Sequence, residues 1–140
     1  MYFWESCEIY RPASKAFVPI ARYFFRVVND VLSTSNLASL ECEFRYIPIV
    51  MPEGMRERYP ARSRLRKKTR VYDCAPQLNY DLFVGGTFEA QVREYAMGIA
   101  REIPKIKGLG ASDGQIAEFE AIIVAVVDRA LVERPDVARN

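Results

Sequence analysis

Residues 56–70 constrain the fold more than any other stretch, because they crowd eight basic side chains around a single acid, Glu57. The basic residues are Arg56, Arg58, Arg62, Arg64, Arg66, Lys67, Lys68 and Arg70. Unpaired charges are rarely buried, so this segment has to lie at the surface. It carries a net charge of +7 whereas the whole protein carries +2, so the remainder sums to −5. We therefore expect a mildly acidic domain that presents one basic arm, defined as residues 56–70, to a partner.

The length of 140 residues predicts one domain, spanning residues 1–140, with a single hydrophobic core. Half of the residues are hydrophobic but no run of about 18 apolar residues occurs, which favours a globular domain over a membrane span. The first ten residues include Glu5 and Glu8 and lack a positively charged lead, which argues against a secretory signal. The sequence therefore predicts a cytoplasmic protein.

The residues that usually carry catalysis are scarce. Histidine is absent, which removes the commonest general base and metal ligand. Cys7, Cys42 and Cys74 are widely spaced and match neither a disulfide framework nor a set of metal ligands. No pair of carboxylates lies in a recognisable catalytic motif. We therefore predict a binding protein that has no catalytic residues, cofactor or metal of its own, and whose cysteines are reduced and largely buried.

Alternation of apolar and polar residues predicts strands over residues 2–10, 40–50 and 69–80. Pro48 and Pro76 favour an edge or an interruption in the second and third of these, because proline cannot donate to a ladder. Apolar residues at steps of three and four predict three helices, which begin near Ser14, Thr87 and Ser112. Ser112 and Gln115 have the form of a capping box.

This order of elements predicts an α+β domain, in which a small, mainly antiparallel sheet of about three strands has three helices packed mostly on one face. The other face of the sheet is expected to be polar enough to meet water or a protein. That face would carry Trp4, Glu41, Glu43, Asp73, Gln77 and Asn79.

Several short motifs resemble a known family. They are Trp4, Ser6 and Glu8 in the first strand, Tyr46-Ile47-Pro48-Ile49-Val50, Tyr59-Pro60 beside basic residues, and Leu78-Asn79-Tyr80-Asp81 with Phe83 ahead of a helix. Over residues 2–105 the chain resembles the bacterial immunity proteins of polymorphic toxin and contact-dependent growth inhibition systems, and is most similar to the immunity protein 44 group. The resemblance implies a protein that binds and neutralises a cognate toxin domain, often a nuclease, without catalysis.

The basic arm supplies the candidate toxin-binding residues, which are Tyr59, Arg62, Arg64, Arg66, Lys67 and Lys68. Forked guanidinium groups suit carboxylates, so the arm could cover the acidic active site of a metal-dependent nuclease.

Other interpretations of the arm stay open. The arm could be a solvated, mobile loop that keeps the protein soluble. The chain could also be a small RNA- or DNA-binding regulatory protein that uses residues 56–70 on phosphates. The overall charge of +2 and the single aromatic residue in the arm, Tyr59, disfavour nucleic acid. If the arm is a bystander, the interface is expected on the sheet face around Trp4, Glu43 and Asp73.

Overall fold

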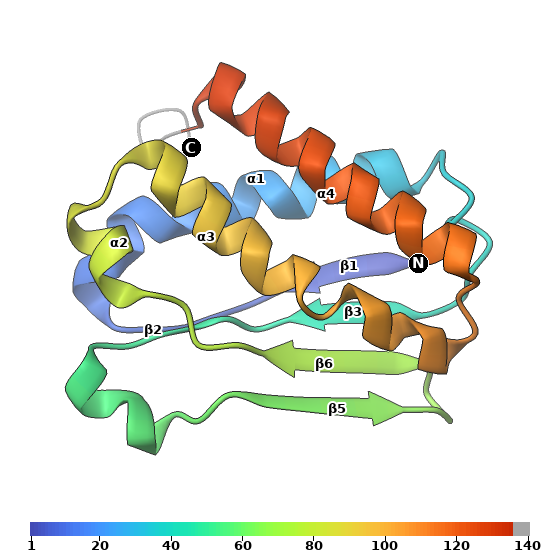
Figure 1. The fold of residues 1–140 in the computed structure, drawn as a ribbon, viewed down its shortest axis with the longest axis horizontal. Coiled ribbons are helices and arrows are strands. Elements are labelled where there is room, and N and C mark those ends of the chain that lie inside the picture. Colours follow the sequence, from blue (N-terminus) through green and yellow to red (C-terminus); the bar gives the residue numbers. More distant parts are fainter. Residues whose placement is uncertain (136–140) are drawn as a thin grey trace.

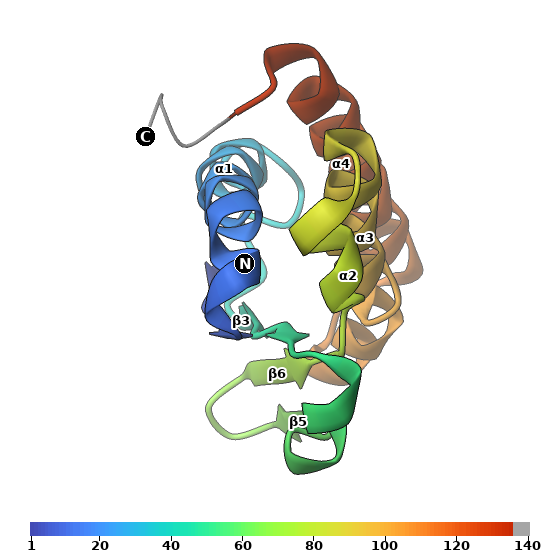
Figure 2. The same cartoon turned by 90° about the vertical axis from the view of Figure 1, so that its left-hand side faces the viewer.

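The computed structural model describes residues 1–135 and shows helices packed on one face of a four-stranded sheet (Figures 1 and 2). The strands of this sheet, in spatial order, are β1 (Tyr2–Glu5), β3 (Glu43–Tyr46), β6 (Val71–Ala75) and β5 (Arg62–Arg66). A second, two-stranded sheet pairs β2 (Glu8–Ile9) with β4 (Ile49–Val50). The α-helices are α1 (Ser14–Leu32), α2 (Tyr80–Gly85), α3 (Phe88–Ala100) and α4 (Asp113–Glu133). The described residues also form three 3₁₀ segments, η1 (Arg11–Ala13) before α1, η2 (Glu53–Arg58) between β4 and β5, and η3 (Ile103–Leu109) between α3 and α4.

The pairing directions correct the expectation of a mainly antiparallel sheet, which is wrong. β3 pairs in parallel with both β1 and β6, β2 pairs in parallel with β4, and only β5 runs antiparallel to its neighbour β6. Parallel neighbours need a connection that returns the chain to its starting end. The long helix α1 provides that return between β1 and β3, and β5 provides it between β3 and β6. The helices do lie mostly on one face, as expected (Figure 2).

The strand boundaries also differ from the expected ones. The stretches 2–10 and 40–50 each divide in two, and the breaks fall at residues 6–7 and at residues 47–48, where Pro48 lies. The third stretch shortens to β6, which ends directly before Pro76. The largest change concerns the arm, because residues 62–66 form β5, an edge strand that joins β6 through a short turn.

The core lies between the helices and the covered face of the sheet. Phe44 of β3 meets Phe119 of α4 edge to face, with ring centroids 5.4 Å apart. Tyr46 is fully buried and its hydroxyl donates to the carbonyl oxygen of Tyr95 at 2.8 Å. A Cβ at Gly98 would lie 2.1 Å from that hydroxyl oxygen, so α3 approaches β3 this closely only because residue 98 has no side chain.

Strand β1 is held from its outer side by a side chain of α1. Asn29 accepts a hydrogen bond from the Phe3 amide at 2.8 Å and donates one to the Phe3 carbonyl at 2.7 Å. Its side-chain amide therefore takes the place of a neighbouring strand.

The cysteines are free thiols, as expected, but only Cys74 is fully buried. Cys7 and Cys42 are half-buried, because they lie just outside the ends of β1 and β3 rather than within a strand. Among residues 1–135, no helix combines the length and apolar character needed to cross a membrane.

Candidate functional site

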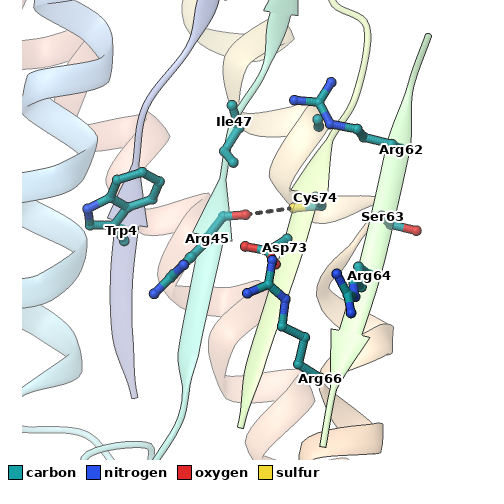
Figure 3. A pocket seen from close by; sticks show the side chains of 10 residues that line it. Trp4, Arg45, Ile47, Arg62, Ser63, Arg64, Arg66, Asp73 and Cys74 are labelled. Carbon is teal, nitrogen blue, oxygen red and sulfur yellow. Dashed lines mark hydrogen bonds and ion pairs between the residues drawn. The ribbon is translucent and has the colours of Figure 1, made fainter. Parts of the chain in front are cut away.

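Within residues 1–135, one face of the four-stranded sheet carries no helix, and we call it the open face. The strand register places a single row of side chains across it. Trp4 of β1 lies beside Arg45 of β3, Arg45 beside Asp73 of β6, and Asp73 beside Arg64 of β5. Side chains two residues apart share a face, so Arg62 and Arg66 point the same way as Arg64. The basic arm and the face around Trp4, Glu43 and Asp73, which the sequence left as alternative interfaces, thus form one surface (Figure 3).

The open face is hollowed into a groove of about 540 Å³. Trp4 and Ile47 line it together with four guanidinium groups and one carboxylate, which belong to Arg45, Arg62, Arg64, Arg66 and Asp73. The groove therefore offers a concave, predominantly positive surface that has one large aromatic ring at its border.

Three of the four arginines already hold an acidic neighbour. Arg62 pairs with Glu8 at 2.5 Å, Arg45 with Glu43 at 2.8 Å and Arg66 with Asp73 at 3.0 Å, measured between nitrogen and oxygen. Ion pairs at an accessible surface contribute only about 0–1 kcal/mol each. These pairs orient the guanidinium groups. Because each pair is weak, replacing its internal carboxylate by a carboxylate of a partner costs little free energy.

Three other basic side chains of the arm have no ion-pair partner among the described residues. Arg64, Lys67 and Lys68 are exposed, and none of them forms an ion pair within the described part of the chain. Trp4 is 37% exposed, and the guanidinium carbon of Arg45 lies 5.6 Å from its ring centroid. The open face thus combines a stacked aromatic–arginine pair on one side with unpaired positive charge on the other.

Tyr59, also proposed from the sequence, follows η2 directly and is half-buried. With Met55 it packs η2 over a small apolar cluster formed by Ile49, Met51 and Ala75. The Gln77 side-chain amide fixes the same segment by donating to the carbonyl oxygens of Tyr59 at 2.8 Å and of Arg56 at 3.1 Å. Tyr59 therefore helps to hold η2 in place and does not line the groove, whereas the five basic candidates lie on β5 or in the turn that follows it.

Arg70 belongs to the arm by sequence but not to the open face by contact. Its backbone is left-handed, with φ of 57°, and its guanidinium donates to the carbonyl oxygens of Glu41, at 2.6 Å, and of Leu109. It ties the end of the arm to η3. Conversely, sequence reasoning did not select Arg45, although its outward parity in the strand pattern gave a usable signal.

Cys74 follows Asp73 in β6, so its thiol turns away from the open face into the core and is poorly suited to nucleophilic chemistry. Burial raises the pKa of Cys74, with a smaller contribution from Glu102 and Asp73, and its sulfur lies 3.6 Å from the Arg45 carbonyl oxygen. A neutral, buried thiol is a weak nucleophile. Within residues 1–135 no group of three metal-ligating side chains converges. What the open face does provide is ion pairing, hydrogen bonding and aromatic contact.

A small mixed α/β domain that displays such a face has the character of a binding protein. The family model of immunity protein 44 matches residues 1–128, and the chain belongs to this family. The family resemblance seen in residues 2–105 is thus confirmed and extends through most of α4. Comparisons with curated proteins and with solved structures found no match.

Proposed function

We propose that the protein binds a cognate toxin domain through its open face and neutralises it by covering the active site of the toxin, which we take to be a nuclease. Membership of the immunity protein 44 family supports a toxin as the partner. The observation that carries the choice of surface is the row formed by Trp4, Arg45, Asp73 and Arg64 across four strands. Under this proposal the protein acts in the cytoplasm of a bacterium that uses contact-dependent growth inhibition or a related toxin system.

The chemistry of the face suits an acidic, carboxylate-lined partner. Arginine binds carboxylates through two parallel hydrogen bonds, which adds geometric selectivity to charge attraction. Trp and Arg are also the residues that most often dominate protein interfaces. Nucleases that use Mg²⁺ hold it with carboxylates, so four guanidinium groups in one groove could pair with the groups that normally hold the metal and its phosphate substrate.

The direct test replaces Arg62, Arg64 and Arg66 together by alanine. Loss of one partner from a buried interfacial charge pair costs roughly 2–5 kcal/mol, so binding of the cognate toxin domain should weaken by orders of magnitude. The melting temperature should barely change, because all three side chains are exposed in the free protein. Calorimetric titration measures the affinity for the toxin, a growth-protection assay measures neutralisation, and a thermal melt measures the melting temperature.

A matched control removes the same charge from elsewhere. Lys15, Lys105 and Lys107 are exposed and lie outside the open face, so their triple replacement by alanine should leave binding intact. The proposal fails if the arginine variant folds and protects as well as the parent protein. It also fails if both triple variants lose affinity equally, since net charge alone would then explain the effect.

One observation favours nucleic acid as a second candidate partner, namely that Trp4 lies among the arginines of the groove. Aromatic rings beside cations can stack on bases while the cations hold phosphates. Glu8, Glu43 and Asp73 on the same surface work against this reading, because they repel phosphate. Titration with a single-stranded oligonucleotide decides the matter. Tight binding that collapses between low and moderate salt would identify nucleic acid, whereas a packed protein interface loses far less.

A further inference from the structure

A second surface, distinct from the open face, lies on the helical side of the molecule. Helices α3 and α4 are neighbours that run in opposite directions (Figure 1), and Arg134, just after α4, stacks over Phe88 at the start of α3 at 4.9 Å. A groove of about 290 Å³ runs between them. Its floor and walls are mostly apolar and come from Ala96, Met97, Ala100, Ile123, Val124 and Val127.

Two large apolar side chains that line this groove are exposed to solvent. Met97 is 45% exposed and Val124 is 62% exposed. The exposed positions of α4 around Val124 include Ala117, Ala121 and Ala125, together with the charged Glu120 and Asp128. Within residues 1–135, the rest of the fold leaves Met97 and Val124 uncovered.

The charges at the border of the groove indicate what covers it. Arg93 on α3 and Asp128 on α4 both line the groove, and they lie at the same end of it because the helices are antiparallel. Asp128 has no ion-pair partner among the described residues, and Arg93 holds only Glu89, one helical turn before it, at 3.2 Å. The surface thus carries one positive and one negative group on opposite sides of an apolar centre.

Such a surface is complementary to itself. If two copies meet about a two-fold axis that runs along the groove, α3 of each copy faces α4 of the other. Arg93 then lies opposite the partner's Asp128, and Met97 lies opposite the partner's Val124. A two-fold interface repeats every contact, so both charge pairs and the apolar centre are used twice.

We propose that the α3–α4 groove binds a second copy of this chain, giving a two-fold symmetric homodimer held by a four-helix contact. The groove shares no residue with the groove of the open face, so a dimer would leave both toxin-binding surfaces available. The inference does not depend on the identity of any toxin.

Charge reversal at the two border residues tests the proposal with its own internal control. Sedimentation of the full chain over a range of concentrations should show a reversible dimer, and Arg93→Asp or Asp128→Arg alone should each weaken it about tenfold or more, because like charges then oppose each other. An equimolar mixture of the two variants should form the dimer again, since each introduced carboxylate faces an introduced guanidinium while native Asp128 of one chain faces native Arg93 of the other. Circular dichroism verifies that each variant is folded.

A second pair of variants tests the apolar centre. Val124→Lys should abolish the dimer, whereas Val84→Lys should leave it unchanged, because Val84 is similarly exposed, at 53%, but lies on α2 outside the groove. A parent chain that stays monomeric at every accessible concentration overturns the proposal. A mixture of the charge-reversed variants that stays monomeric overturns the two-fold arrangement, and loss of toxin binding in Val124→Lys without a change of oligomeric state would assign the groove to the toxin instead.

Discussion

Arg70 and Arg64 belong to the same basic arm, but the first stabilises the fold and the second is available to a partner. Arg70 donates to two backbone carbonyls and so belongs to the fold, whereas Arg64 is exposed and unpaired within the described residues. Arg70→Ala should lower the free energy of unfolding by about 1–3 kcal/mol, because the carbonyls of Glu41 and Leu109 lose a charged donor. Arg64→Ala should change it by less than about 0.5 kcal/mol. Urea denaturation measures both values.

Toxin binding should rank the same two variants in the opposite order, with Arg64→Ala the weaker binder. Equal losses of stability in the two variants would show that the division between structural and partner-facing arginines is wrong. Sequence reasoning alone could not make this division, because it depends on which carbonyl groups the tertiary fold brings beside each guanidinium.

The three thiols should also separate by environment. Burial raises the pKa of Cys7, Cys42 and Cys74, but only Cys74 is almost fully covered. A raised pKa lowers the thiolate fraction at a given pH, and the thiolate is the species that reacts. At pH 8 a disulfide reagent should therefore label all three more slowly in the native protein than in urea, and Cys74 last. Immediate labelling of Cys74 in the native state would contradict its placement in β6.

At the scale of elements, the approach of α3 to β3 depends on one glycine. Gly98→Ala should destabilise the protein by about 1–3 kcal/mol, because the new methyl group would collide with the buried Tyr46 hydroxyl and force a core helix to shift. Gly85→Ala is the matched control, since a Cβ at Gly85 meets no atom within 4 Å. Thermal melts of the two variants make the comparison, and equal melting temperatures would rule out the close contact.

Periodicity in the sequence predicted the long helices well and the sheet only in part. The capping box of Ser112 and Gln115 and the Thr87 cap are confirmed, but the first long helix is preceded by Ala13, and Ser14 instead donates to the Arg11 carbonyl oxygen. The outward direction predicted for Trp4 and Asp73 is also confirmed (Figure 3). Pairing direction was not predictable, because alternation along a strand reports which face is buried and not which way the neighbouring strand runs.

Strand β5 was not predicted from the sequence, because the high density of charge in the arm obscured its alternating pattern. Arg62, Arg64 and Arg66 alternate with Ser63 and Leu65, which is strand periodicity, and Leu65 turns away from the open face to pack on Gly108 of η3. Helix α2 was missed for a different reason, since six residues are too few to show a helical period.

At the scale of the whole molecule, the separation of charge should govern how fast a partner arrives. The arm carries +7 on a body of −5, so it should steer an acidic partner towards the open face from a distance. Raising the salt concentration should therefore lower the association rate constant for the toxin domain markedly and change the dissociation rate constant much less. Stopped-flow measurements at several salt concentrations test this. If salt changes only the dissociation rate constant, the basic side chains act within the bound interface and do not steer the toxin towards it.

The convergence of the arm and the outward sheet face was likewise beyond the sequence. Trp4 and Arg64 are far apart in the chain, and they share a row only because three successive registers align them. Local sequence patterns identified most residues of the open face but could not show that they lie side by side.

The side-chain amide of Asn29 has a consequence for how copies of the sheet behave at high concentration. A bare strand at the border of a sheet is a template onto which another chain can add, and such addition leads to aggregation. Asn29 occupies the hydrogen-bonding groups of Phe3 on the β1 border, and the arginines of β5 repel a like-charged strand at the other border. Both routes to lateral growth are therefore obstructed. We expect the free protein to reach high concentrations before it meets a partner without its strands joining into fibres.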